Sequence, residues 1–196
     1  MNMRVSSGTS LKRGFTIVEL VIIIFVIAIL AVIAFVSYRG IKARSDNART
    51  VSNIQQYYNA IELYRARTGA YPKVPGEGNG TVTMVCLGTG YPGGKCGKIT
   101  GTNIFESATF MKELQDGSGT DISAIVNNQF GAVSNENFTG AAYGIDLTDN
   151  HHSSTGRARM IEWFLAGDDQ DCKIPKAWNY ASDGGNTACE LDFEDF

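Results

Sequence analysis

The stretch that decides the fold is Lys12-Arg13-Gly14-Phe15-Thr16-Ile17-Val18-Glu19, and it opens an apolar run from Leu20 to Val36 that holds no other charge. Glu19 is the exception, because an isolated carboxylate at the centre of a membrane-spanning helix costs about 2.5–3.5 kcal/mol, and less near its end. A charge kept at that cost needs a partner or a function. The sequence therefore predicts that Glu19 meets an opposite charge, and another chain is the expected source.

The apolar run is long enough to cross a bilayer. Residues 15–36 cover 22 positions, about 33 Å of α-helix, which matches a hydrocarbon core of about 30 Å. A secretory signal peptide has a shorter apolar region of roughly 7–15 residues. A plain membrane anchor fits the length but needs neither Glu19 nor the Gly14–Phe15 junction. Basic residues flank the run on both sides and do not set its orientation: Arg4, Lys12 and Arg13 before it, Arg39, Lys42, Arg44 and Arg49 after it.

A short basic leader that ends in Gly14, followed by Phe15 and by a glutamate four residues later, closely resembles the processing site of type IV pilins and type II secretion pseudopilins. The resemblance implies cleavage by a prepilin peptidase between Gly14 and Phe15, methylation of the new Phe15 amine, and polymerisation through the N-terminal helix. It also implies that Glu19 pairs with the Phe15 amine of a neighbouring subunit, an attraction strengthened by low dielectric. Many pilins carry a proline inside this helix, whereas this chain has none before Pro72.

The same resemblance implies a setting and a set of partners. The chain is expected to be a single-pass protein of the inner membrane with its head outside, and then a homo-oligomer in a helical filament at the cell surface, served by a prepilin peptidase, a membrane platform and an assembly ATPase. Its role stays open between a pilin for adhesion, motility or DNA uptake, a secretion pseudopilin, and a minor pilin that binds a surface or DNA. The net charge of −3 argues against a generic nucleic-acid binder, so a nucleic-acid partner has no support here.

Residues 37–68 contain no proline and only one glycine, and their apolar positions recur at helical spacing, which predicts one continued helix from Phe15 to Thr68. Gly69 is the expected C-cap, and Pro72 prevents the helix from resuming. The exit around Tyr64, Gly69 and Tyr71-Pro72 is a second resemblance to pilins. The expected organisation is a leader (1–14), an apolar assembly helix (15–36), its amphipathic continuation (37–71) and a head (72–196). The expected core stripe is Ile41, Ala48, Val51, Ile54, Tyr58, Ile61 and Tyr64.

The predicted fold class is α+β, with the long helix packed on a small antiparallel sheet. The glycine-rich stretch Lys73–Thr102 is expected to be an irregular loop, and Asn103–Gln115 a short helix. Alternating apolar residues in Ala142–Leu147 and Arg159–Leu165 predict a hairpin around the polar turn 149–156. The acidic tail 190–196 is expected to form an edge strand or a frayed end.

Four cysteines in an exported chain predict two disulfides. Three pairings are possible, and we favour the nearest ones, Cys86 with Cys96 and Cys172 with Cys189, because each would close one glycine-rich loop. The second pairing would resemble the C-terminal disulfide loop of many pilins. A structural zinc site is the alternative, but the spacings include no paired C-x-x-C knuckles.

Other candidate sites are weaker. Asp168, Asp169, Asp171 and Asp183 could gather around calcium, as in some major pseudopilins, but the EF-hand spacing is absent and a solvated acidic loop is the alternative. The pair His151-His152 lies in a polar turn without ligand spacing around it. Residues 88–96 lack the spacing of a phosphate-binding loop. With no recognisable catalytic constellation, the sequence predicts neither an enzyme nor a cofactor.

Overall fold

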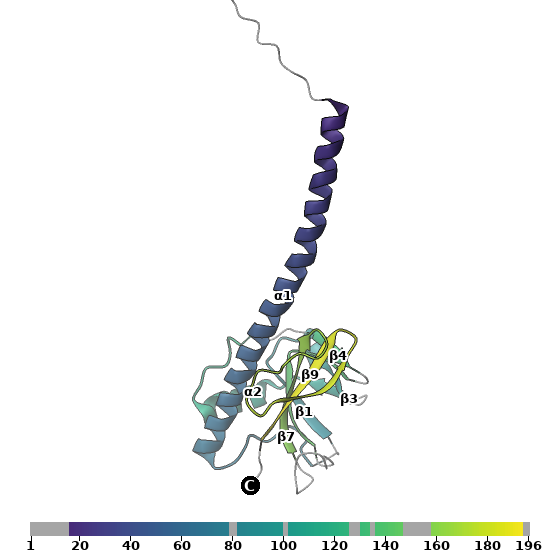
Figure 1. Ribbon diagram of the computed structural model, residues 1–196. Coiled ribbons are helices and arrows are strands. Elements are labelled where there is room, and N and C mark those ends of the chain that lie inside the picture. Colours follow the sequence, from purple (N-terminus) through teal and green to yellow (C-terminus); the bar gives the residue numbers. More distant parts are fainter. Residues whose placement is uncertain are drawn as a thin grey trace, which may run out of the picture. The chain divides into compact units, whose positions relative to one another are not determined.

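The computed structural model describes residues 16–78, 82–99, 102–125, 130–133, 136–146 and 158–193. The chain divides into two compact units, Met1–Ile41 and Lys42–Phe196. Helix α1, Ile17–Thr68, is 52 residues long and contributes to both units, whereas every other helix and strand of the described residues belongs to the second (Figure 1). The prediction of one continuous helix that ends at Thr68 is confirmed over the described residues.

The end of α1 follows from its local sequence. Gly69 adopts a left-handed conformation with φ of 83°, and its N–H donates to the carbonyl of Arg65 at 2.8 Å. Glycine reaches this conformation without the steric cost that a Cβ atom brings. The Thr68 hydroxyl donates to the Tyr64 carbonyl at 2.8 Å and satisfies another terminal acceptor. The predicted Gly69 cap is therefore present.

Within the second unit, α1 buries a stripe of side chains at spacings of three and four. Ile54, Tyr57 and Ile61 are completely buried. Two of these belong to the predicted stripe and Tyr57 does not. The prediction for Ile41 is wrong, since its side chain is 67% exposed. The amphipathic face that contacts the head therefore begins later than the spacing of apolar residues indicated.

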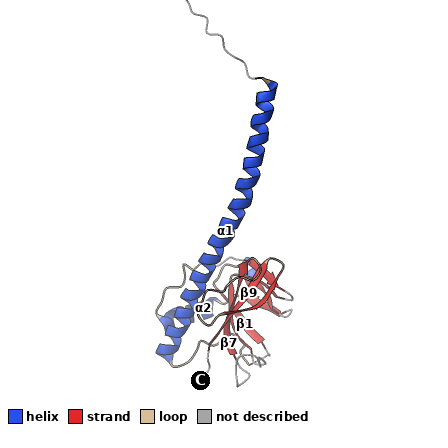
Figure 2. Cartoon of the chain, viewed as in Figure 1, coloured by secondary structure: helices blue, strands red, loops and turns tan. Residues whose placement is uncertain are grey.

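In the described residues, nine strands form one sheet in the order β4-β5-β2-β3-β1-β6-β7-β9-β8. Figure 2 shows the strands gathered beside the end of α1. Neighbouring strands are antiparallel except for β1 and β3, which are parallel. The α+β prediction is confirmed, with a sheet larger than the small one expected. The strands are β1 (Val82–Leu87), β2 (Lys95–Ile99), β3 (Thr102–Phe105), β4 (Phe130–Val133), β5 (Glu136–Thr139), β6 (Ala141–Asp146), β7 (Ala158–Ala166), β8 (Trp178–Asp183) and β9 (Asn186–Phe193).

The prediction that Lys73–Thr102 is an irregular loop is wrong. It contains β1, a 3₁₀ turn at Pro92–Gly94, and β2, whose register shifts between Lys95 and Gly97. Its described glycines lie outside the strands except for Gly97 in β2, and this glycine-rich composition concealed the strand pairing. The second helix, α2, spans Ala108–Ser118 rather than Asn103–Gln115. It starts later because Ser107 caps it, accepting the Phe110 N–H at 3.2 Å, and because Ile104 lies in β3.

Strands β6 and β7 pair as an antiparallel hairpin, as the alternation predicted, with Tyr143 opposite Ile161. Leu147 and the predicted turn lie outside the described residues. Residues 190–193 of the tail belong to β9. Glu190 pairs with both β7 and β8, which corrects the expectation of an edge strand there, whereas residues 191–193 pair with β7 alone and form an edge as expected. The apolar Leu191 and Phe193 are buried there, which outweighs the acidic composition between them. Residues 194–196 lie outside the described residues.

Both faces of the sheet are buried in the second unit. Helices α1 and α2 lie against one face (Figure 1). The core cluster on this side includes Tyr57 of α1, Phe110 of α2 and Trp163 of β7. The other carries a second cluster that includes Cys86, Ile104 and Phe164. Strand β4 returns over this second face, where a Cβ atom on Gly131 would come within 2.2 Å of the Phe164 ring. A full-sized side chain at that position would push β4 off the cluster.

A buried ion pair fixes the segment that follows α1. The guanidinium of Arg159, on β7, binds both carboxylate oxygens of Glu77, at 2.7 and 3.1 Å, and donates to the Pro72 carbonyl at 3.2 Å. Partial burial alone would raise the pKa of Glu77, but the hydrogen bonds and the charge of Arg159 outweigh it and hold that pKa below its usual range. The Tyr143 hydroxyl donates to the same Pro72 carbonyl at 3.1 Å. These contacts anchor the chain where it leaves the helix.

Candidate functional site

The first turn of α1 holds Glu19 in a capping box. The Thr16 N–H and the Thr16 hydroxyl both donate to Oε2 of Glu19 at 2.9 Å, and the Glu19 N–H donates back to the Thr16 hydroxyl at 3.2 Å. In such a box, a Thr before the helix and a Glu three residues later satisfy terminal N–H groups that the helix cannot. This local role was not among the predictions from sequence, although the Thr-x-x-Glu spacing is its signal.

The capping box occupies only one oxygen of the carboxylate. Oε1 of Glu19 has no hydrogen-bond partner among the described residues, and the side chain is exposed. The box also fixes the side chain against the helix start, so the free oxygen has a defined position. Gly14 and Phe15, the predicted cleavage and methylation positions, lie outside the described residues.

The helix after Glu19 presents apolar side chains on every side. An 18-residue window of α1 has a mean hydropathy of 3.4 and none of it is buried, so the helix is long and apolar enough to cross a membrane. In water such a surface would be strongly unfavourable, since burying one large apolar side chain is worth about 1.5–3 kcal/mol. These side chains are at least 46% exposed: Ile17, Val18, Leu20, Val21, Ile22, Ile23, Ile24, Phe25, Val26, Ile27, Ile29, Leu30, Val32, Ile33 and Phe35.

The four cysteines form two disulfides in the structure, Cys86–Cys96 and Cys172–Cys189. The first closes the loop between β1 and β2, and the second ties the segment after β7 to β9. All four side chains are buried. The first bond thus joins two strands of the sheet, and the second joins a connecting segment to the sheet.

The predicted calcium ligands do not come together as a metal site. Oδ1 of Asp168 accepts the Gly185 N–H at 2.9 Å, and Asp171 pairs with Lys173. Hydrogen bonds from Lys173 hold the pKa of Asp171 below its usual range. Across the described part of the chain, no group of three or more His, Cys, Asp or Glu side chains has an arrangement that could hold a metal ion. His151 and His152 lie outside that part.

A side chain missed by the sequence analysis anchors α1 to the head. The Asn47 carboxamide accepts the Ala166 N–H at 2.8 Å and donates to the Ala166 carbonyl at 2.9 Å, at the end of β7. One amide thus pairs both backbone groups of a strand residue. Nothing in the local sequence marked Asn47, because its partner is 119 positions away.

Comparison with known proteins identifies the N-terminal segment. The family model described as the prokaryotic N-terminal methylation motif matches residues 9–35, which include Gly14, Phe15 and Glu19. No curated protein and no solved structure gives a significant match to the chain. The chain therefore carries the N-terminal methylation motif that is the signature of type IV pilins and pseudopilins.

Proposed function

We propose that this chain is a structural subunit of a type IV pilus-like filament. A prepilin peptidase cuts between Gly14 and Phe15 and methylates the Phe15 amine. The mature subunit waits in the inner membrane with its head outside and then joins a surface filament, driven by a membrane platform and an assembly ATPase. In this proposal residues 1–14 are the leader, 15–36 the assembly helix, 37–71 its amphipathic continuation and 72–196 the head.

The observation that carries the proposal is the state of Glu19. Its carboxylate lies at the start of an apolar helix, one oxygen is held by Thr16, and the other has no partner among the described residues. A charged amine from another copy would satisfy that oxygen. Opposite unit charges attract much more strongly in a low-dielectric bundle than in water, and either charge alone is penalised there. The pair would therefore set the axial position of one subunit against the next.

The exposed apolar side chains of α1 support the same proposal. In the membrane they face lipid, and in a filament they face the helices of other copies, so both states avoid water. A heterologous contact joins two different surfaces of neighbouring copies. When its repetition does not close into a ring, it generates a helical filament. The contact between the Phe15 amine of one copy and Glu19 of the next is heterologous in this sense.

The proposal is tested in a strain whose only copy of this chain is supplied on a plasmid. Surface fibres are sheared, and the N-terminus of the recovered chain is determined by mass spectrometry. The expected result is abundant chain that begins with methylated Phe15. Processed chain that stays in the membrane fraction, with none in the sheared fibres, would favour a secretion pseudopilin. Unprocessed chain, or a different first residue, would contradict both roles.

A further inference from the structure

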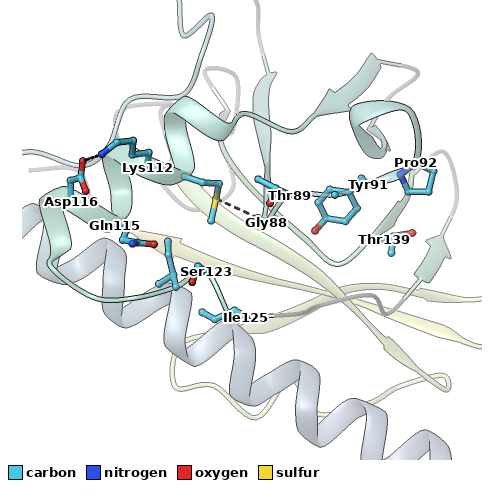
Figure 3. A pocket seen from close by; sticks show the side chains of 13 residues that line it. Gly88, Thr89, Tyr91, Pro92, Lys112, Gln115, Asp116, Ser123, Ile125 and Thr139 are labelled. Atoms are coloured by element: carbon cyan, nitrogen blue, oxygen red, sulfur yellow. Dashed lines mark hydrogen bonds and ion pairs between the residues drawn. The ribbon is translucent and has the colours of Figure 1, made fainter.

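A cleft of about 780 Å³ opens in the head at the loop that follows β1 (Figure 3). Its walls are this loop, one face of α2 and the segment after α2. The volume falls within the roughly 300–1,000 Å³ of typical small-molecule sites. The lining residues are Gly88, Thr89, Gly90, Tyr91, Pro92, Met111, Lys112, Gln115, Asp116, Ile122, Ser123, Ile125 and Thr139.

The loop wall is fixed by the fold before any ligand arrives. The Tyr91 N–H donates to Glu106 at 2.9 Å, and the Tyr91 hydroxyl donates to the Leu87 carbonyl at 2.9 Å. The Cys86–Cys96 disulfide closes the base of the same loop. A site that is already ordered loses less conformational entropy when it binds.

The α2 wall and the segment after it are fixed as well. Ser107 caps the start of α2, and the left-handed Gly119 ends it with an N–H bond to the Gln115 carbonyl at 2.8 Å. In the next segment, Asp121 accepts both the N–H and the hydroxyl of Ser123, at 3.0 and 2.7 Å. Each of the three walls is therefore held by hydrogen bonds within the protein.

The chemistry of the cleft is amphipathic and uncharged overall. Met111, Ile122 and Ile125 supply apolar surface, and Tyr91 adds an aromatic ring. The Gln115 carboxamide and the hydroxyls of Thr89 and Thr139 have no hydrogen-bond partner among the described residues, so they are available to a ligand.

The two charges in the lining neutralise each other. Lys112 pairs with Asp116 one helical turn away. An anionic ligand such as a phosphate would be attracted by Lys112 but repelled by the adjacent Asp116. A cationic ligand would be attracted by Asp116 but repelled by Lys112. An extended peptide would need an unpaired strand edge, but the strand residue in the lining, Thr139, belongs to β5, which lies between β4 and β2.

We propose that this cleft binds a short neutral saccharide. Sugar rings combine apolar C–H faces with uncharged hydroxyls, and the cleft offers an apolar floor with free amide and hydroxyl groups at its walls. The proposal goes beyond filament assembly and does not depend on it, because it rests on the head alone.

The test uses the full mature chain in a zwitterionic detergent, since a sugar-headed detergent would compete. Saturation-transfer NMR is recorded with the methyl glycosides of glucose, galactose, mannose and N-acetylglucosamine, and with sialyllactose and the tripeptide Gly-Ser-Thr. At least one neutral glycoside should give saturation transfer, and sialyllactose and the tripeptide should give none. Absence of transfer from every neutral glycoside, or transfer only from sialyllactose or the tripeptide, would overturn the proposal.

Variants then locate the site. Thr89→Trp fills the cleft from its rim and should abolish binding, whereas Thr109→Trp, on an exposed part of α2 outside the lining, should leave it unchanged. Gln115→Ala removes one hydrogen-bonding group and should weaken binding roughly fivefold. If Thr89→Trp does not fold, Gln115→Ala decides the question. Glycoside binding that is unchanged in every folded cleft variant would show that the site lies elsewhere and that this cleft is not it.

Discussion

Removing the charge of Glu77 should destabilise the head substantially, because the mostly buried Arg159 would lose the carboxylate that binds its guanidinium with two hydrogen bonds. The Arg159 side chain is only 11% exposed and that of Glu77 24%. Breaking a fully buried pair from one side costs about 3–5 kcal/mol. Because Glu77 is partly exposed, water can solvate part of the Arg159 charge after the substitution. The Pro72 carbonyl also still accepts one hydrogen bond from Arg159. We therefore expect Glu77→Gln to cost about 2–3 kcal/mol of unfolding free energy.

Urea unfolding of the full chain in detergent, followed by tryptophan fluorescence, measures this loss, since Trp163 is completely buried in the head core. Glu77→Gln, Arg159→Met and the double variant form a double-mutant cycle that isolates the coupling between the two side chains. The control is Asp116→Asn, which breaks an ion pair whose side chains are 75% and 61% exposed. That change should cost less than about 0.5 kcal/mol.

The pH dependence of the Glu77→Gln effect has a definite sign. The pKa of Glu77 is lower in the folded state than in an unfolded chain. Its contribution is therefore present above the unfolded pKa of about 4.3 and is lost as the pH falls through the lower folded value. Wild type and Glu77→Gln should thus converge in stability in acid. A cost at neutral pH no larger than that of Asp116→Asn, or a coupling energy near zero, would refute this reasoning.

Three other predictions concern processing, the head and the helix start. Gly14→Ser should block cleavage and leave unprocessed chain in the membrane, which N-terminal mass spectrometry detects; a normal yield of chain starting at Phe15 would contradict it. Replacing Cys172 and Cys189 together by serine should cost about 3 kcal/mol of unfolding free energy, since the bond closes a connection with a sequence separation of 17; an unchanged urea midpoint would oppose this. Thr16→Val removes the two hydrogen bonds of the Thr16 hydroxyl, the one donated to Oε2 of Glu19 and the one accepted from the Glu19 N–H, and should lower the amount of chain in sheared fibres, whereas Thr16→Ser should not; equal amounts in both would show that these hydroxyl bonds have no role in assembly.

The long helix could be predicted from sequence because its signals are local. The apolar run, the helical spacing and the stop at Gly69 each depend on neighbours within a few positions, and the helix ends at Thr68 as predicted. The β6–β7 hairpin was found for the same reason, since alternation within each strand is a local pattern. The methylation motif is contiguous, which is why the N-terminal segment could be recognised without a fold.

The missed features depend on contacts between distant residues. β3 pairs in parallel with β1 and antiparallel with β2, and neither partner could be recognised from the short, glycine-flanked segments themselves. Strand β8 covers the outer edge of β9 as far as Glu190, and Trp178–Asp183 had no clear alternation to predict that strand. Asn47 and the Arg159–Glu77 pair act across 119 and 82 positions. The Thr16–Glu19 capping box was missed for a different reason, because its signal is local. The cost of a charge in an apolar run led us to expect a partner for Glu19 in another chain and not in the same helix turn.

The central claim is that Glu19 registers each subunit in a filament, and replacing it tests that claim most directly. Glu19→Val and Glu19→Asp are each expressed as the only copy of the chain, and the protein in sheared surface fibres is compared with the processed protein in membranes. Glu19→Val should be cleaved after Gly14 and should fold, because losing the charge favours membrane insertion. Its amount in fibres should fall sharply, while Glu19→Asp keeps the charge and should retain more. Fibres that contain as much Glu19→Val as wild type would contradict the account.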